Sequence, residues 1–525
     1  MIHGKNRIGF SLSSEGSKTF KAFNPSTLQE LDESFFSATE NEIELAMQKA
    51  WNAYTIYKHF SGKHKAAFLD AIADEIMNLG NALIERVAAE SGLTEARIIS
   101  ERGRTIWQLQ IYSRLLQEGS WVDATIDNAI PNREPLPKPD IRKMLRPVGP
   151  VVVFSASNFP LAYSTVGGDT ASALAAGNPV IVKAHASHPG TNLLMAEAIN
   201  AAAIKTGMPD GIFSTLYDGG FEVGISLVKH PLTKSVGFTG SFTGGMALYN
   251  AAREREEPIP VFAEMGSLNP IILLPEKLKN DYTEIGKILA GSVTNGMGQF
   301  CTKPGLIAAI GDNGFDNFVQ LLSSEIQKVN PTPLINKNIW ESFHQKRSKV
   351  LQEKGVSLVA ETIDENTKLK GRPTLAIVDF ETYNKNPFLS EEVFGPFSLI
   401  IKCKDMNELE SFSISLKGQL TVSIFATEKE WLENTNLVHI LEEKAGRIIF
   451  NGPPTGVEVC SSIIHGGPFP ASTDGRFTSV GPEAIKRFVR PVAFQNAPQH
   501  LLPDELKEGN PLKIWRKVDG QFGNS

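Results

Sequence analysis

Apolar residues recur at helical spacing through most of the first third of the chain. Residues 38–57 read ATENEIELAMQKAWNAYTIY, in which Thr39 and Glu42 have the three-residue spacing of a capping box. Two further amphipathic helices are predicted within residues 64–92, separated at a glycine, and another within residues 100–119. The first third is therefore expected to be mostly helical.

The pattern then changes twice. Residues 127–150 are rich in proline, which suits an extended crossing segment or an edge hairpin. From Val151, short apolar runs such as VVVF and PVIVK alternate with helical stretches, and a second alternating region runs from Pro270 to about residue 488. This alternation predicts βαβ units and parallel, doubly wound sheets.

Composition narrows the class of protein. The 525 residues are too many for one hydrophobic core, so two or three domains are expected. The formal net charge is −6 and no long basic run occurs, so no nucleic-acid partner is predicted. No run of 18 apolar residues could span a membrane, and the first 20 residues lack the apolar core of a signal peptide. Three cysteines are too few for a disulfide framework, and together these features predict a cytoplasmic protein.

One cysteine stands in unusual surroundings. Cys301 lies in NGMGQFCTKPG, where glycines let the backbone approach a ligand and leave little for a thiol to pack against. Cys403 ends the apolar run LIIKC and is predicted to lie in the core. Cys460 is expected either near the substrate or as a small apolar filler.

Two features could hold a nucleotide. FTGSFTGG, residues 238–245, carries a strand into a helix, and its glycines, Gly240 and Gly245 among them, leave backbone N–H groups accessible beside the hydroxyl of Ser241. Such a helix N-terminus can bind a pyrophosphate, although a purely structural turn is an equal alternative. Lys183 ends the strand PVIVK and would point into the crevice where parallel sheets bind ligands, unless it is simply solvated.

Two polar residues also follow apolar strands. Glu264 in VFAEMGS would have a raised pKa, as a general base needs, or would be a surface carboxylate at a strand end. Asn158 in SASNFP could donate to an oxyanion or could merely form a turn. His185 and His188 have no carboxylate or cysteine beside them, so no metal site is predicted.

The order of these signals is more informative than any one of them. Asn158, Lys183, FTGS, Glu264, GQFC and the stretch EEVFGP follow the order and approximate spacing of the aldehyde dehydrogenase superfamily, which the chain resembles over roughly residues 20–495. The stretches EMGSLNP, GQFCTKPG, NGPPTGVEV and HGGPFPASTDGRFTSVG resemble one branch of it. That branch comprises the 2,5-dioxopentanoate (2-oxoglutarate semialdehyde) dehydrogenases, with the NADP-dependent bacterial fatty aldehyde dehydrogenases as close relatives.

The resemblance implies a role for each candidate. Cys301 would attack the aldehyde to give a thiohemiacetal and then a thioester, with the oxyanion held by Asn158 and the backbone N–H of Cys301. Glu264 would activate the water that hydrolyses the thioester. The implied cofactor contacts are Lys183 at the adenosine ribose, Gly240 and Ser241 at the pyrophosphate with Gly245 in the same turn, Glu392 on the nicotinamide ribose and Phe394 beside the nicotinamide.

The resemblance also implies an α/β fold with two doubly wound parallel-sheet domains and a small β oligomerisation element. The expected boundaries are 1–122 and 143–265 for the cofactor-binding domain, 266–486 for the catalytic domain, 123–142 and 487–500 for the oligomerisation element, and 501–525 for a C-terminal tail. By family analogy, the protein would be a homodimer or a dimer of dimers.

Cofactor preference should depend on Ala186 and Ser187. NAD-preferring relatives carry a glutamate at the position of Ala186, and that carboxylate would repel a 2′-phosphate. Its absence, with the charge of Lys183 and a hydroxyl from Ser187, predicts that NADP is preferred and NAD is still accepted.

The leading substrate is 2,5-dioxopentanoate, and a medium- or long-chain fatty aldehyde is the alternative. An arginine in the entrance tunnel would favour the acid, whereas an apolar tunnel would favour the fatty aldehyde. Arg104 is the candidate for binding the carboxylate, with a surface salt bridge to Glu101 as its other interpretation.

Two other classes of function compete with these. A binding protein that has lost catalysis is disfavoured by the intact set of Asn158, Glu264 and Cys301. A Cys–His hydrolase lacks a histidine in any convincing sequence context, although an activated thiol could cleave esters as a side reaction.

Overall fold

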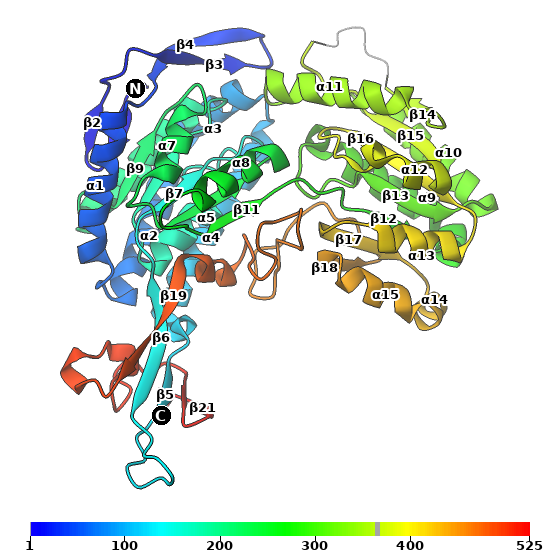
Figure 1. The fold of residues 1–525 in the computed structure, drawn as a ribbon. Coiled ribbons are helices and arrows are strands. Elements are labelled where there is room, and N and C mark those ends of the chain that lie inside the picture. Colours follow the sequence, from blue (N-terminus) through cyan, green and yellow to red (C-terminus); the bar gives the residue numbers. More distant parts are fainter. Residues whose placement is uncertain (1, 363–367, 525) are drawn as a thin grey trace.

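A computed structural model describes residues 2–362 and 368–524 of the chain. It contains two seven-stranded sheets flanked by helices, a five-stranded sheet that projects from the body of the molecule, and a two-stranded hairpin (Figure 1). The predicted α/β class with two doubly wound sheets is confirmed. In the described ranges, no helix has the length and apolar character that crossing a membrane requires.

The first sheet is parallel through five strands and ends in two antiparallel ones. Its order is β11 (Val261–Glu264), β10 (Ser235–Thr239), β7 (Val151–Phe154), β8 (Val180–Lys183), β9 (Phe213–Leu216), β1 (Asn6–Ile8) and β2 (Ser11–Ser13). The central strands are apolar on both faces because helices cover both. Val151 and Val153 face one helical layer, while Val152 faces the other.

Eight helices surround this sheet. The layer that contacts Val151 and Val153 contains α2 (Gly62–Asn78), α3 (Gly80–Ser91), α4 (Glu95–Glu118), α5 (Gly168–Ala176) and α6 (Pro189–Lys205). The opposite layer contains α1 (Glu40–Tyr57), α7 (Glu222–Lys229) and α8 (Phe242–Arg253). The predicted capping box of α1 is confirmed, since Thr39 and Glu42 each bond the other's backbone N–H.

The second sheet repeats the plan with one antiparallel edge strand. Its order is β14 (Ser357–Glu361), β15 (Thr374–Asp379), β16 (Phe397–Cys403), β13 (Leu306–Ile310), β12 (Ile271–Leu273), β17 (Gln419–Phe425) and β18 (Ala445–Phe450). Helices α9 (Pro275–Thr294) and α10 (Asn313–Gln327) pack on one face. The remaining helices are α11 (Lys337–Gln352), α12 (Phe380–Lys385), α13 (Met406–Ser415), α14 (Glu428–Glu433) and α15 (Thr435–Glu442).

The first 36 residues are not helical, contrary to the expectation for the first third of the chain. They form β1 and β2 at the edge of the first sheet and the hairpin of β3 (Thr19–Asn24) with β4 (Gln29–Phe36). Strands as short as β1 and β2 have too few residues for a clear alternating pattern. Their stability comes from pairing β1 with β9, about 200 residues away in sequence.

The five-stranded sheet contains the proline-rich segment as a hairpin. Its order is β19 (Val489–Gln495), β6 (Ile141–Pro147), β5 (Thr125–Asp127), β20 (Arg516–Val518) and β21 (Gln521–Gly523). Residues 501–525 were expected to form a C-terminal tail. Within the described part of this segment, β20 and β21 join the five-stranded sheet, and Leu506 and Ile514 pack with Ile126 in its core.

We predict that Leu506→Ala destabilises the five-stranded sheet. Leu506 is fully buried, so truncation leaves a cavity that typically costs about 2–4 kcal/mol. Calorimetry and hydrogen exchange of β5 amides should show earlier melting. Leu501, which is 66% exposed, supplies the control variant Leu501→Ala, which should change little. Equal behaviour of the two variants would mean that residues 501–525 do not stabilise the sheet.

Candidate active site

Cys301 follows a tight turn between α9 and β13. The turn contains positive φ angles at Gly296, Met297 and Gly298. A β-carbon at Gly298 would lie 2.3 Å from the carbonyl oxygen of Gly395, so the backbone contact there requires glycine. The glycines of the motif thus let the turn pack against the loop that contains Gly395. The half-buried thiol lies at the end of this turn, before β13 begins.

His465 is the nearest basic group to this thiol. Its Nε2 lies 3.3 Å from Cys301 Sγ and 3.0 Å from Glu264 Oε1. The residue belongs to the irregular segment 451–481, whose backbone also bridges to Glu264 through Ser472. The sequence around Cys301 offers no histidine, and chain folding brings this one from 164 residues away.

These three side chains could in principle hold a metal ion. One ligand atom of each lies within 4.8 Å of the others, and thiolate, imidazole and carboxylate all bind zinc. The same three groups form the contacts expected of a nucleophile and its bases. The positive charge of Arg104 acts against the upward shift in the pKa of Cys301, and the same charge would repel a cation at this position.

Glu264 ends β11 in a buried position. Its Oε2 accepts a hydrogen bond from Ser479 Oγ at 2.5 Å. Burial alone raises the pKa of this carboxyl, but His465, Ser479 and Cys301 together outweigh burial, and the pKa falls below its ordinary value. The expectation of a raised pKa was wrong, because Ser479 and His465, which are distant in sequence, pack against this strand end and donate to the carboxylate.

Cys301 has the opposite shift. Burial raises the pKa of its thiol well above the ordinary value, Glu264 raises it further, and Arg104 partly opposes both. The thiol is therefore protonated at neutral pH. A neighbouring base must remove its proton before it can act as a nucleophile.

Asn158 follows β7 and lies beside the Cys301 turn. Its Nδ2 donates to the carbonyl oxygen of Gln299 at 3.1 Å, and the amide group has a second N–H to offer. Ile335 N donates to Gln299 Oε1, which fixes the segment that Asn158 contacts. The amide is thus held against the turn that contains Cys301.

Arg104 does not form the alternative salt bridge with Glu101. Glu101 is buried, its Oε1 accepts from the amides of Leu161 and Ala162, and its Oε2 pairs with Arg97. Arg104 instead donates from Nη2 to Tyr163 Oη at 3.2 Å. Its side chain is therefore directed along α4 toward the aromatic residues around Cys301.

Lys183, Ala186 and Ser187 lie together at the end of β8. Lys183 Nζ contacts the carbonyl oxygen of Asp218 at 3.4 Å, and burial lowers the pKa of the lysine. Ser187 Oγ accepts from Asn336 Nδ2 at 3.0 Å, which links this loop to the start of α11. Ala186 is half-buried and offers no charge.

The predicted pyrophosphate turn opens α8. Ser241 caps this helix, accepting from Gly244 N at 3.2 Å, and Gly240 is exposed. Gly245 is buried, and a β-carbon at this position would lie 2.7 Å from Met265 Sδ. The small size of Gly245 therefore lets α8 pack closely on the end of β11.

The donor set fits a nicotinamide dinucleotide. Across the residues that the structure describes, Lys183 takes part in no ion pair, although it is largely buried. A lysine without an ion-pair partner at a parallel strand end, beside an accessible helix N-terminus, is a site for phosphate-bearing ligands. Lys183 and the turn at Gly240 and Ser241 would hold such a cofactor.

Glu392 and Phe394 lie in the loop before β16. Burial raises the pKa of Glu392 to about 6, with Lys303 and Lys346 opposing the shift. A β-carbon at Gly266 would lie 2.4 Å from Glu392 Oε2, so the loop packs closely against the chain that follows Glu264. Phe394 is half-buried beside it.

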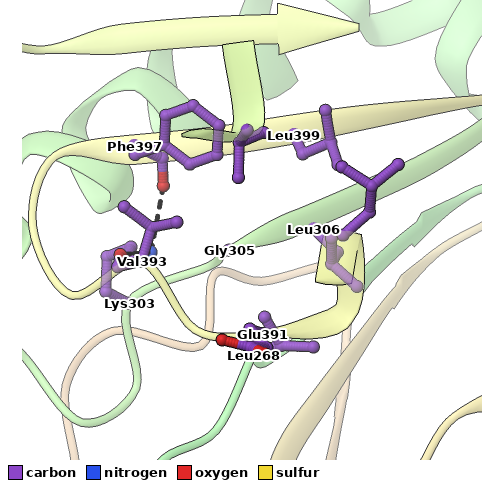
Figure 2. A pocket seen from close by; sticks show the side chains of 10 residues that line it. Leu268, Lys303, Gly305, Leu306, Glu391, Val393, Phe397 and Leu399 are labelled. Carbon is purple, nitrogen blue, oxygen red and sulfur yellow. Dashed lines mark hydrogen bonds between the residues drawn. The ribbon is translucent and has the colours of Figure 1, made fainter. Parts of the chain in front are cut away.

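Lys303 ties this loop to the Cys301 turn, and the sequence interpretation missed it. Its buried Nζ donates to the carbonyl oxygens of Val393 at 3.1 Å and Phe397 at 2.9 Å (Figure 2). The cavity that Lys303 lines has a volume of about 10 Å³. That is room for roughly one water molecule, so this cavity holds neither cofactor nor substrate.

The other two cysteines give opposite outcomes. Cys403 is fully buried within the second sheet, which confirms its assignment to the core. Cys460 is exposed, so the expectation of an apolar filler was wrong. It follows Val459, whose carbonyl accepts from Trp107 Nε1 at 3.0 Å.

The fold and the cysteine-centred site agree with comparison to known proteins. The sequence model of the aldehyde dehydrogenase family matches residues 12–491, and the chain belongs to that family. Alpha-ketoglutaric semialdehyde dehydrogenase 2 of Azospirillum brasilense is 44% identical over 521 residues, covering 99% of each chain. Alpha-ketoglutaric semialdehyde dehydrogenase of Acinetobacter baylyi is also 44% identical, covering 99% of this chain and 98% of its own.

Solved structures support the fold alone. A 1-pyrroline-5-carboxylate dehydrogenase mutant from Thermus thermophilus has a TM-score of 0.80 at 21% identity, covering 94% of this chain and 92% of its own. Betaine aldehyde dehydrogenase from Staphylococcus aureus has a TM-score of 0.81 at 19% identity, covering 95% and 96%. These similarities confirm an aldehyde dehydrogenase fold.

We predict that Ser479→Ala moves the acidic limb of the pH–rate profile for aldehyde oxidation to higher pH. Ser479 helps to lower the pKa of Glu264, so its loss makes the carboxylate protonate earlier as the pH falls. A hydrogen bond to a charged group is worth about 1.5–3 kcal/mol, which corresponds to a shift of about one unit or more. The exposed Ser462 gives the control Ser462→Ala. An unmoved limb would contradict a role for this bond.

Proposed function

We propose that this aldehyde dehydrogenase oxidises 2,5-dioxopentanoate to 2-oxoglutarate with a nicotinamide cofactor. The observation that carries the proposal is the placement of Cys301 Sγ 3.3 Å from His465 Nε2, which itself lies 3.0 Å from Glu264. The 44% identity to two alpha-ketoglutaric semialdehyde dehydrogenases over nearly the whole chain supports the choice of substrate.

Cys301 acts as the nucleophile, and the paired Glu264 and His465 take its proton. His465 Nε2 lies within hydrogen-bonding distance of both Cys301 Sγ and Glu264 Oε1, so the thiol faces this carboxylate–imidazole pair directly. Because the pKa of the buried thiol is raised, this proton transfer is what makes it reactive at neutral pH. The thiolate then adds to the aldehyde carbon.

Asn158 stabilises the oxyanion of this adduct. Its second amide N–H and the backbone N–H of Cys301 would both donate to the oxygen, and one such donor typically contributes about 3 kcal/mol to the barrier. The cofactor, when bound, supplies the hydride acceptor that turns the thiohemiacetal into a thioester. The residues that would hold the cofactor are Lys183, Gly240, Ser241, Glu392 and Phe394. Gly245 lets helix α8 pack closely beside them.

Glu264 completes the cycle as the base for hydrolysis. Its lowered pKa keeps it ionised at neutral pH and able to accept a proton from water. The hydroxide adds to the thioester carbon, the C–S bond breaks, and Cys301 regains its proton as the acid leaves. Ser479 holds the carboxylate in position.

We further propose that NADP is the preferred cofactor and that NAD is accepted. Ala186 presents no carboxylate to a 2′-phosphate, and Lys183 supplies a positive charge on the same loop. Ser187 Oγ accepts from Asn336, so its own hydroxyl proton remains available to a phosphate oxygen.

We also propose that the protein forms a homodimer or a dimer of dimers through the five-stranded sheet. The five-stranded sheet ends at β19, whose outer edge is unpaired among the described strands. Such an edge can pair with a second copy, as expected of a homodimer or a dimer of dimers. A mechanism that needs a free thiol suits a reducing compartment, and we propose the cytoplasm.

Cys301→Ala is expected to abolish reduction of NADP by 2,5-dioxopentanoate, because no other thiol lies beside His465. Cys403→Ala and Cys460→Ala should retain most of the activity, since one is in the core and the other is exposed. Steady-state assays of the three variants measure this. Substantial turnover by Cys301→Ala would exclude the covalent mechanism.

His465→Gln provides the companion variant for the proton transfer. Its rate should fall about 100-fold or more at neutral pH, and it should recover partly as rising pH removes the thiol proton without a base. A flat and undiminished profile would remove His465 from the mechanism and leave the role of Cys301 intact.

We expect Ala186→Glu to shift cofactor preference toward NAD. Two like charges about 4 Å apart in a partly solvated site cost on the order of a few kcal/mol, enough for a hundredfold change. The ratio of kcat/KM for NADP and NAD measures the effect. The control is Lys229→Glu, which places a negative charge on an exposed helix end. Ala184 lies on the same loop as Ala186, but it is buried and is therefore unsuitable as a control. A wild type that favours NAD, or an unchanged ratio in Ala186→Glu, would contradict the assignment.

A further inference from the structure

Three arginines gather around Cys301. Arg97 and Arg104 come from α4, and Arg447 comes from β18 in the other sheet. Arg104 Nη2 donates to Tyr163 Oη, and the Tyr163 ring lies 6.4 Å from that of His465. Arg447 holds the carbonyls of Pro454 and Gly456, and Thr455 between them donates from Oγ1 to the carbonyl oxygen of Thr302, the residue after Cys301. These contacts place both arginines beside the turn that contains the thiol.

Arg97 has its partners within the protein. It pairs with the buried Glu101 at 3.5 Å, and its guanidinium lies 4.6 Å from the ring of Phe159 and 4.5 Å from that of Phe300. Cation–π contacts of this kind hold the group in place between the two rings. Arg97 thus forms a wall of the site and needs no ligand.

Arg104 and Arg447 differ because their charges are uncompensated. Neither takes part in an ion pair with any residue in the described ranges 2–362 and 368–524, and the Nε of each is buried without a hydrogen-bond partner. Unpaired Nε atoms also occur at Arg86 and Arg372, but both of those arginines form ion pairs with glutamates. Arg516 has an unpaired Nε as well, but it lies in the five-stranded sheet, where it holds the carbonyl oxygens of Glu505 and Lys507.

A half-buried guanidinium group whose Nε is buried without a hydrogen-bond partner is costly unless a ligand supplies an acceptor. Arg104 makes one hydrogen bond, to Tyr163 Oη, and Tyr163 remains protonated because burial raises its pKa well above the ordinary value. The Tyr163 hydroxyl can therefore donate to the same anion. Arg447 uses its Nη atoms to hold the carbonyls of Pro454 and Gly456, which leaves its Nε–H.

We propose that Arg104 and Arg447 form a receptor for a 2-oxo acid group, with Arg104 binding the carboxylate and Arg447 Nε donating to the adjacent keto oxygen. This inference rests on the proposed function and specifies which feature of the substrate the site recognises. In 2,5-dioxopentanoate the carboxylate lies four C–C bonds from the aldehyde carbon, about 5 Å when extended. A fatty aldehyde would leave both cations unpaired.

The two arginines come from different parts of the chain, and each would bind a different group of the substrate. Arg104 offers a planar fork suited to a carboxylate, whereas Arg447 is fixed by its carbonyl partners and offers one directed donor. Any five-carbon acid semialdehyde would satisfy Arg104. Only one with the 2-oxo group would satisfy Arg447.

The first test compares Arg104→Met with wild type on 2,5-dioxopentanoate and on pentanal, a neutral aldehyde of the same length. We expect kcat/KM for the acid to fall on the order of 100-fold, because a buried charge loses its partner. Pentanal turnover should change only a few-fold, which shows that the variant is folded. Arg114→Met is the matched control, since Arg114 is exposed on the same helix and stacks on Trp107.

The second test uses Arg447→Lys, which keeps the charge near Pro454 and Gly456 but loses the Nε donor. We expect the preference for 2,5-dioxopentanoate over 5-oxopentanoate, which lacks only the keto group, to fall about tenfold. Pentanal turnover should persist. A collapse on all three aldehydes would assign Arg447 a structural role and overturn its part in the receptor.

The outcomes separate this inference from the proposed function. A wild-type enzyme that favours pentanal over both acids would overturn the proposed substrate and the receptor together. A wild type that favours 2,5-dioxopentanoate, with an unchanged ratio of acid to pentanal in Arg104→Met, would overturn the receptor alone. A loss confined to the acids in Arg104→Met, with a loss confined to the keto acid in Arg447→Lys, supports the receptor.

Discussion

Glu264 is only 4% exposed, yet its surroundings keep it charged, and much of the site follows from that constraint. A buried carboxylate needs hydrogen-bond donors or an opposite charge. Here they are supplied by Ser479 and His465, both from the irregular segment that follows the second sheet. The same imidazole nitrogen that stabilises Glu264 approaches Cys301 Sγ. The charge of one residue and the reactivity of another are thus coupled through a single ring.

This arrangement requires both large sheets. Glu264 comes from β11 in the first sheet, while Cys301 precedes β13 in the second. Arg104 and Arg447 approach the thiol from opposite sheets in the same way. Lys303 and the contact between Gly298 and Gly395 fix the turn that holds the thiol. Small displacements between the sheets would separate Glu264 from Cys301 and change the contacts of both with His465.

The sequence predicted what depends on local order and missed what depends on distant contacts. The capping box at Thr39, the parallel strands and the core position of Cys403 all follow from short-range patterns, and the structure confirms them. His465 gave no such signal, because it lies in a segment without regular structure and meets Cys301 only through folding. The lowered pKa of Glu264 was missed for the same reason, since its donors are more than 200 residues away.

The five-stranded sheet is assembled from segments made at very different times. Roughly 390 residues of chain separate Asp127, which ends β5, from Arg516, which begins β20, and the two strands are parallel neighbours. At ribosomal rates of about 5–20 residues per second, β5 must wait tens of seconds for that partner. During synthesis, this edge of β5 presents unpaired backbone groups that could pair with another nascent chain. The order in which the sheet is completed therefore makes this strand a point where a chaperone would protect the unfinished protein.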